Sequence, residues 1–303
     1  MKKIASLLSA LAMTASLYAQ DTTPTEEEND SIWTVGGNTG LFFQQVGLKN
    51  WAGGGEDALA YGGEVNLYAN KFTEKHTWNN TLQAGYGLVK IGDANARKNN
   101  DVLMVNSQYG RFMTDNWQLA VGLDFRTQFA NGYIYGGAAD GTDSLISTFL
   151  APGYATVYIG ATYKPNEAFS ATLSPLTEKV TIVSDDELAA KGAYGVDPGE
   201  NVRWQTGWSV NTQYQKEIMT NVNLKTALLL FGDYEESRHV DVNFDLFLNF
   251  KVNKYITTNF SLQAIYDHDI KIEDEDGNVA PRTQLRNVLN IGVVYNFGDP
   301  LPK

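Results

Sequence analysis

The sequence contains no cysteine among its 303 residues. This absence excludes disulfides, thiolate chemistry and a lipid-modified cysteine anchor, so backbone pairing and packing must supply the stability. Beyond the first twenty residues no run of about 18 apolar residues occurs, which excludes a transmembrane helix. The mean hydropathy is −0.29. Transmembrane strands are compatible with that value, because polar and apolar residues alternate along them.

Positive charge is scarce as well. The chain has 23 Lys and Arg against 35 Asp and Glu, a net charge of −12, which becomes −14 if Lys2 and Lys3 leave with a signal peptide. An acidic exterior disfavours nucleic acid as a partner. The glycines of "AGGGED" and "YGG" lack the strand-to-helix context of a phosphate-binding loop. We therefore expect neither a nucleic-acid partner nor a cofactor.

The amino terminus predicts export. In "MKKIASLLSALAMTASLYAQ" two lysines precede an apolar stretch from Ile4 to Met13, and Ala19 stands where cleavage is expected. This is the pattern of a secretory signal peptide, assigned to residues 1–19. Residues 20–32 include "DTTPTEEEND", an acidic composition expected to be disordered.

Alternation of apolar and polar residues dominates the rest of the chain. In "WQLAVGLDFRTQF" (117–129) the apolar side chains share one face of an extended strand, and Asp124 and Arg126 share the other. Twelve segments of this kind are predicted, at about 33–46, 58–70, 76–89, 101–112, 117–129, 153–163, 168–183, 202–215, 221–232, 240–250, 255–267 and 283–297. For residues 101–112 and 168–183 the alternation does not show which side chains point to which face of the strand.

The connections between these segments alternate in length. Short turns such as "MTDN" and "KPNE" follow every even-numbered segment, whereas the longer links, at about 47–57, 90–100, 130–152, 184–201, 233–239 and 268–282, follow the odd ones. Aromatic residues gather at the short-turn ends: Trp33, Trp78, Trp117, Tyr163, Tyr214, Phe250 and Phe297. Short periplasmic turns, long external loops and aromatic girdles are typical of an outer-membrane barrel.

The sequence therefore predicts an all-β fold, a transmembrane antiparallel up-and-down β-barrel of about twelve strands. The barrel is assigned to residues 33–298 and a C-terminal tail to 299–303. The apolar face is expected to meet outer-membrane lipid, and "VYNF" near the end resembles the closing-strand signal read by the barrel assembly machinery. The alternative is a secreted soluble β-sandwich or barrel.

Two stretches, "LKNWAGGGED" and "LSPLTEK", carry a resemblance to a known family. With the sequence around them, which spans essentially the whole mature chain, they resemble the Bacteroidetes-type family catalogued as domain of unknown function 3078. The resemblance implies an outer-membrane barrel. It supplies no activity and no catalytic residues.

Eight charged residues are predicted to line the interior of such a barrel: Glu64, Asp124, Arg126, Arg203, Lys225, Asp241, Asp245 and Arg286. One hypothesis is a narrow pore or transporter for a small hydrophilic solute, because twelve strands lie between small filled barrels and open porins. Another is a sealed structural or partner-docking barrel, in which the same charges pair across the interior. The oligomeric state is not indicated.

A rim-located lipid-modifying enzyme is the third hypothesis. His239 and His268 fall at outward strand ends, with Ser237 and Ser261 in the same region, while His76 falls at a periplasmic turn. No spacing requires a nucleophile and base to meet, so no catalytic residue is assigned and an enzyme is not expected.

Two of the external loops have further signals. The sixth concentrates possible oxygen ligands for Ca²⁺ or Mg²⁺ without EF-hand spacing: Asp267, Asp269, Glu273, Asp274, Glu275 and Asp276. The fourth, "SDDELAAKG", predicts a short helix with Ser184 at its start and Gly192 at its end. A solvated charge run is the simpler explanation of the acidic loop, and no metal site is assigned.

Overall fold

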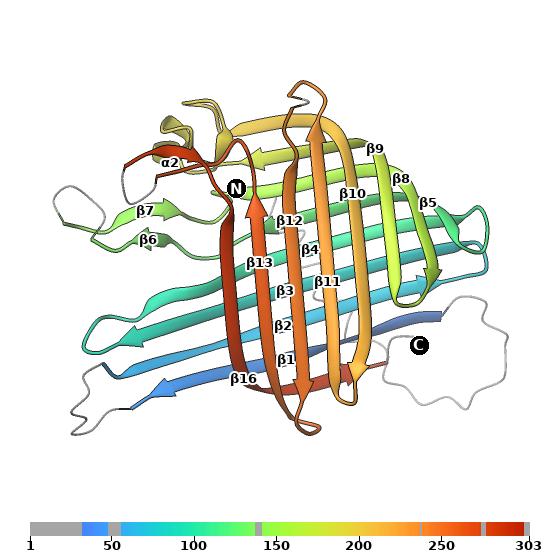
Figure 1. The fold of residues 1–303 in the computed structure, drawn as a ribbon, viewed down its shortest axis with the longest axis horizontal. Helices are drawn as coiled ribbons and strands as arrows, with labels where there is room; N and C mark the ends of the chain where they lie inside the picture. Colours follow the sequence, from blue (N-terminus) through green and yellow to red (C-terminus); the bar gives the residue numbers. More distant parts are fainter. Residues whose placement is uncertain (1–31, 48–55, 137–140, 237, 274–276, 300–303) are drawn as a thin grey trace, which may run out of the picture. The chain divides into compact units, whose positions relative to one another are not determined.

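The computed structural model describes residues 32–47, 56–136, 141–236, 238–273 and 277–299. Twelve antiparallel strands close into a barrel in the order β1-β16-β13-β12-β11-β10-β9-β8-β5-β4-β3-β2 (Figure 1). Their bounds are β1 Ile32–Val46, β2 Ala58–Phe72, β3 His76–Ile91, β4 Arg97–Phe112, β5 Trp117–Thr127, β8 Gly153–Asn166, β9 Phe169–Ile182, β10 Val202–Met219, β11 Val222–Asp233, β12 Asp241–Lys251, β13 Ile256–Tyr266 and β16 Gln284–Gly298. The predicted twelve-stranded fold is confirmed.

The long connections contain small elements that the alternation did not predict. Two hairpins, β6 (Gly132–Ile134) with β7 (Ser144–Ser147) and β14 (Lys271–Glu273) with β15 (Val279–Pro281), form separate two-stranded sheets. They lie with the helical connection between β9 and β10 at the ends of the strands opposite the short turns (Figure 1). In the described ranges, no helix is long and apolar enough to cross a membrane.

The predicted helix in the fourth long connection is present but begins differently. It is α2, Asp186–Ala190, and a 3₁₀ turn, η2, follows at Ala193–Gly195. Asp185, not Ser184, is the N-cap, because its carboxylate accepts hydrogen bonds from the backbone N–H groups of Glu187 and Leu188. The Ser184 hydroxyl instead donates to the Phe149 carbonyl. Gly192 has φ +65°, as expected for the residue that ends the helical segment.

Strand β9 is irregular, which explains why alternation did not show which of its side chains point outward. Its register shifts against β8 between Ile159 and Ala161, and against β10 between Gly207 and Ser209. Both irregularities surround Pro175, which lacks an N–H group to donate to a neighbouring strand. The extra residue at this bulge interrupts the two-residue period, so the faces exchange along the strand.

Candidate functional site

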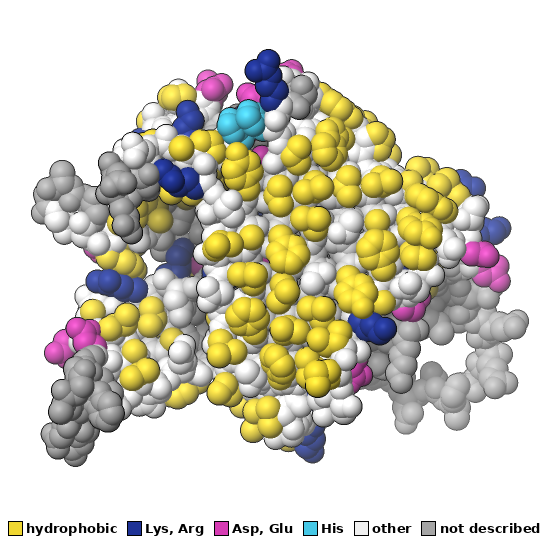
Figure 2. Space-filling model, viewed as in Figure 1, with side chains coloured by type: hydrophobic (Ala, Val, Ile, Leu, Met, Phe, Trp, Pro, Cys, Tyr) yellow, Lys and Arg dark blue, Asp and Glu magenta, His cyan; other side chains and the backbone are white. Residues whose placement is uncertain are grey.

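The outer face of the barrel is apolar. On β16 five outward apolar residues are 57–70% exposed, namely Leu285, Leu289, Ile291, Val293 and Tyr295. Figure 2 shows apolar side chains spread over the face made by β10–β13 and β16, with charged side chains mainly at the ends of the strands. An exposed apolar surface of this extent fits contact with lipid rather than water.

Aromatic pairs mark the short-turn end of this surface. The rings of Trp33 and Trp78 lie 5.6 Å apart, and those of Trp117 and Tyr163 lie 4.9 Å apart. Indole and phenol rings favour the membrane–water interface, because one edge of the ring is apolar and the other is polar. This end of the barrel therefore has the girdle of a membrane-spanning wall.

The strand register places all eight predicted interior charges on the face opposite the apolar rows. These residues are Glu64 on β2, Asp124 and Arg126 on β5, Arg203 on β10, Lys225 on β11, Asp241 and Asp245 on β12, and Arg286 on β16. They do not form one cluster. They divide between a contact across the interior, an ion-pair network beside the long loops, and separate positions on the wall.

The contact across the interior joins opposite walls. Arg126 Nη2 donates to Gln263 Oε1 at 3.2 Å, and Gln263 Nε2 donates to Asp245 Oδ1 at 2.8 Å. Strands β5 and β13 lie six positions apart in the ring of twelve, so these side chains span the barrel. A second long-range contact runs from Arg286 Nη2 on β16 to Asn100 Oδ1 on β4, at 2.8 Å. Side chains alone therefore narrow the interior at this level.

The ion-pair network centres on Lys179 and Arg203. Lys179 Nζ lies 2.7 Å from Asp241 and 3.0 Å from Asp267, and all three side chains are less than one-fifth exposed. Arg203 Nη1 lies 2.9 Å from Asp269 Oδ2 and also donates to the Gly195 carbonyl. The network joins the start of the sixth long connection to the walls of β9, β10 and β12.

Five residues whose side chains form these contacts were not among the predicted ones: Asn100, Lys179, Gln205, Asp233 and Gln263. Lys179 is on β9, where the bulge hides the facing. Gln205 Nε2 donates to Asp233 at 3.3 Å and to Asp269 at 3.0 Å. Alternation could have placed Gln205 and Gln263 on the inner face, but it contains no signal for their height in the barrel.

A small apolar core forms beside this network. It consists of Ala151, Val183, Leu188, Ala189 and Val196, with Ala193 and Tyr194 packed against them. Tyr194 donates from its hydroxyl to the Ile146 carbonyl, and burial raises the pKa of this phenol to about 12. Tyr194 also has φ +60°, a left-handed conformation that is strained for a bulky residue. The surrounding packing therefore holds this loop in a specific conformation.

The histidines form two aromatic contacts. At the short-turn end, Tyr109 Oη lies 2.7 Å from His76 Nδ1. At the other end, the rings of His239 and His268 stack with centroids 3.4 Å apart. Ser261 lies seven residues before His268, about 23 Å along an extended strand, and Ser237 lies outside the described residues. Neither histidine is therefore placed as a base for Ser261.

The acidic sixth loop contributes to the ion pairs. Of its six predicted oxygen ligands, Asp267 and Asp269 contact Lys179 and Arg203. Glu273 ends β14, and Asp274, Glu275 and Asp276 lie outside the described residues. In the described part of the chain no three His, Asp or Glu residues are grouped so as to hold a metal ion.

A closed ring of twelve strands with an apolar outer face and a charged inner face defines a membrane-spanning β-barrel. Residues 43–133 match the model of the family described as Protein of unknown function (DUF3078). The predicted resemblance to domain of unknown function 3078 is thus confirmed over that range, which includes "LKNWAGGGED", whereas its Bacteroidetes-type attribution stays a prediction. The "LSPLTEK" stretch lies beyond it.

No curated protein sequence matches the chain. Among solved structures, it is similar to an outer membrane channel from Pseudomonas putida F1, with 13% identity, 90% of this chain and 100% of that chain covered, and a TM-score of 0.41. The NanC porin gives 10% identity, 87% and 100% coverage, and a TM-score of 0.38. The outer membrane channel DcaP of Acinetobacter baumannii gives 7% identity, with 91% of this chain and 100% of that chain covered, and a TM-score of 0.32. Likenesses this distant carry no inference about activity.

Proposed function

We propose that this protein is a narrow outer-membrane channel for small hydrophilic solutes. The observation that carries the proposal is the hydrogen-bonded chain from Arg126 through Gln263 to Asp245. It crosses a polar interior with side chains alone, so rotation of Arg126 would widen the path without breaking the wall. Phe247, which faces inward beside Lys225, is 37% exposed, which indicates open space inside the barrel.

The charges at this constriction favour small anions. Arg126 and Arg286 contribute two guanidinium groups close enough to repel each other, and Asp245 is the one carboxylate in the hydrogen-bonded chain with Arg126. Changing the sign of one charge in a confined path alters the energy of a passing ion by about 1.4 kcal/mol at a separation of about 6 Å in water. Because this change disfavours the anion and favours the cation by the same amount, the ratio of anion to cation permeability should fall about a hundredfold in Arg126→Glu.

Planar-bilayer conductance of the purified barrel tests this function. The wild type should give small, weakly anion-selective steps, Arg126→Ala larger steps, and Arg126→Glu cation-selective ones. Lys164→Ala is the matched control, because Lys164 pairs with Glu167 at the short-turn end, away from the constriction. If the wild type and both Arg126 variants are silent, transport through the barrel is refuted.

A sealed structural barrel is the second candidate, favoured by the ion-pair network of Lys179 and Arg203 with Asp241, Asp267 and Asp269. Such a network can close the interior permanently. Silence of every variant in the bilayer, with an intact fold, would support this candidate. Hydrolysis or acyl transfer on lipid vesicles by the purified protein would instead support the rim enzyme, whose histidines have no serine partner within the described residues.

We further propose that the mature chain begins at Gln20 and is inserted into the outer membrane by the barrel assembly machinery. The argument is the signal-peptide pattern at residues 1–19 together with the apolar outer wall. The protein should fractionate with outer membranes, migrate faster on gels before boiling than after it, and give Gln20 on N-terminal sequencing. Recovery of an unprocessed chain from the cytoplasm would contradict the proposal.

A further inference from the structure

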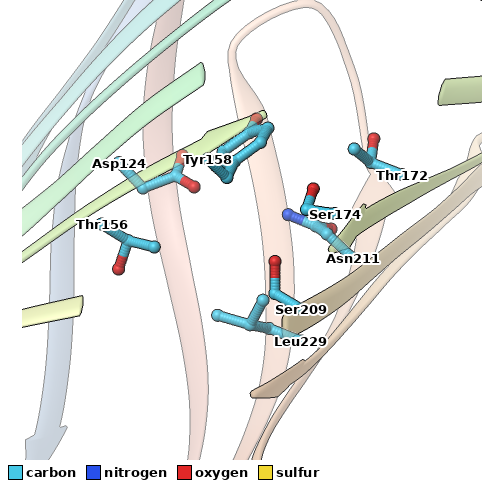
Figure 3. Close-up of a pocket in the computed structure, with 8 residues that line it drawn as sticks. All are labelled: Asp124, Thr156, Tyr158, Thr172, Ser174, Ser209, Asn211 and Leu229. Carbon is cyan, nitrogen blue, oxygen red and sulfur yellow. The ribbon is translucent and has the colours of Figure 1, made fainter. Parts of the chain in front are cut away.

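A small cavity lies in the inner wall between β5, β8, β9 and β10 (Figure 3). The volume open to the centre of a water molecule is about 10 Å³, which is room for roughly one water or an ion of that size. Seven of its eight lining residues have polar side chains and the eighth is Leu229, although carbon atoms form most of the surface that faces the cavity. This cavity is separate from the Arg126–Gln263 contact and from the ion pairs of Lys179.

Most of the polar lining groups have unused hydrogen-bonding capacity. Thr172 and Ser209 are already bonded, to Thr162 and Thr177. In contrast, the side chains of Asp124, Thr156, Tyr158, Ser174 and Asn211 form no hydrogen bond with any other part of the chain that the structure describes. Ser174 is only 3% exposed, and its Oγ is buried without a partner. A buried hydroxyl left unpaired is costly, so an occupant is expected.

The charge of the lining residues indicates which kind of occupant the cavity favours. Asp124 forms no ion pair within the described residues, although most of its surface is covered. Arg126, two residues further along the same strand, reaches to Gln263 on the opposite wall. Lys179, on the neighbouring wall, is bound to Asp241 and Asp267. A covered carboxylate without a close counter-charge favours a cation beside it.

We propose that this cavity binds a monovalent cation of about the size of a water molecule, such as K⁺ or NH₄⁺. Asp124 supplies the negative charge, and the hydroxyls of Tyr158 and Ser174 and the amide oxygen of Asn211 supply neutral oxygen ligands. Divalent cations fit less well, because Asp124 is the one carboxylate in the lining and balances a single positive charge, and because Mg²⁺ retains an octahedral water shell.

Thermal unfolding of the purified barrel in detergent tests the site. Replacing choline chloride by KCl or NH₄Cl at constant ionic strength should raise the wild-type Tm by about 3 °C and then saturate. Asp124→Asn keeps the shape of the side chain and should abolish the rise, and Ser174→Ala should weaken it. Glu64→Gln is the matched control, because it removes a different inner carboxylate and should retain the rise.

A crystal soaked in Tl⁺ gives a second readout that does not depend on stability. One anomalous peak within reach of Asp124, absent in Asp124→Asn, is expected. No dependence on KCl or NH₄Cl, an equal rise in Asp124→Asn, or no Tl⁺ peak in the cavity would overturn the proposal and leave a water molecule as the occupant. Because neither readout is a conductance, the outcome is independent of channel activity.

Discussion

Replacing Lys179 by methionine should destabilise the barrel strongly. The ammonium group lies 2.7 Å from Asp241 and 3.0 Å from Asp267, and the three side chains are 13%, 18% and 11% exposed. Lys179→Met removes the cation and leaves two covered carboxylates facing each other. Breaking a buried ion pair by removing one partner costs about 3–5 kcal/mol, and the repulsion between the remaining charges puts the expected loss at the upper end.

Reversible urea unfolding in lipid vesicles, followed by tryptophan fluorescence, measures this loss. Lys164→Met provides the control, because the Lys164–Glu167 pair has the same chemistry at a more exposed position and should cost no more than about 1 kcal/mol. Adding Asp241→Asn and Asp267→Asn to Lys179→Met should restore most of the stability, because neutral amides do not repel. A loss in Lys179→Met no larger than in Lys164→Met would refute the reasoning.

Three further outcomes are expected. Leu123→Cys should react with lipid-soluble maleimides and Lys225→Cys with membrane-impermeant ones, because the two residues face opposite sides of the wall; the reverse labelling would mean an apolar interior. Gly122→Ala should cost about 1–3 kcal/mol in urea unfolding, since its Cβ would lie 2.1 Å from the Tyr158 ring, and Tyr158→Ala should remove most of that cost. Tyr194, whose raised pKa favours its neutral form, should stabilise its loop fully below pH 10 and lose this effect as the pH rises towards 12; the hydrogen-exchange protection factors of α2, which are corrected for the base-catalysed intrinsic rate, should fall over this range in the wild type but not in Tyr194→Phe.

The strands were predictable because one physical rule governs them all. A wall with lipid on one side and polar groups on the other imposes a two-residue period, which β12 follows with Val242, Phe244 and Leu246 outside and Asp241 and Asp245 inside. Where local chemistry breaks that rule, the prediction fails. On β4 the outward Ser107 interrupts the apolar row, and it is bonded to Trp78 and Asn80, so its hydroxyl is satisfied on the lipid side.

The contacts of the inner wall were not predictable for a different reason. Alternation gives the face of a residue, but the stagger between strands sets its height, and each turn and bulge changes that stagger. Arg126 and Gln263 are 137 residues apart and meet only because the ring closes with β5 opposite β13. The ion pairs of Lys179 also require the sixth long connection to fold back to the wall, which no local pattern indicates.

The ring closes where β1 meets β16, and this junction is short. Eight residue pairs join the two strands, from Gly36 with Gly298 to Phe43 with Ile291, whereas fifteen join β1 to β2. Backbone hydrogen bonds hold each junction together in lipid, so the free energy needed to separate two neighbouring strands rises with the number of paired residues. The β1–β16 junction is therefore where neighbouring strands should separate first under heat or mechanical load. A disulfide engineered across it would close the ring of strands covalently.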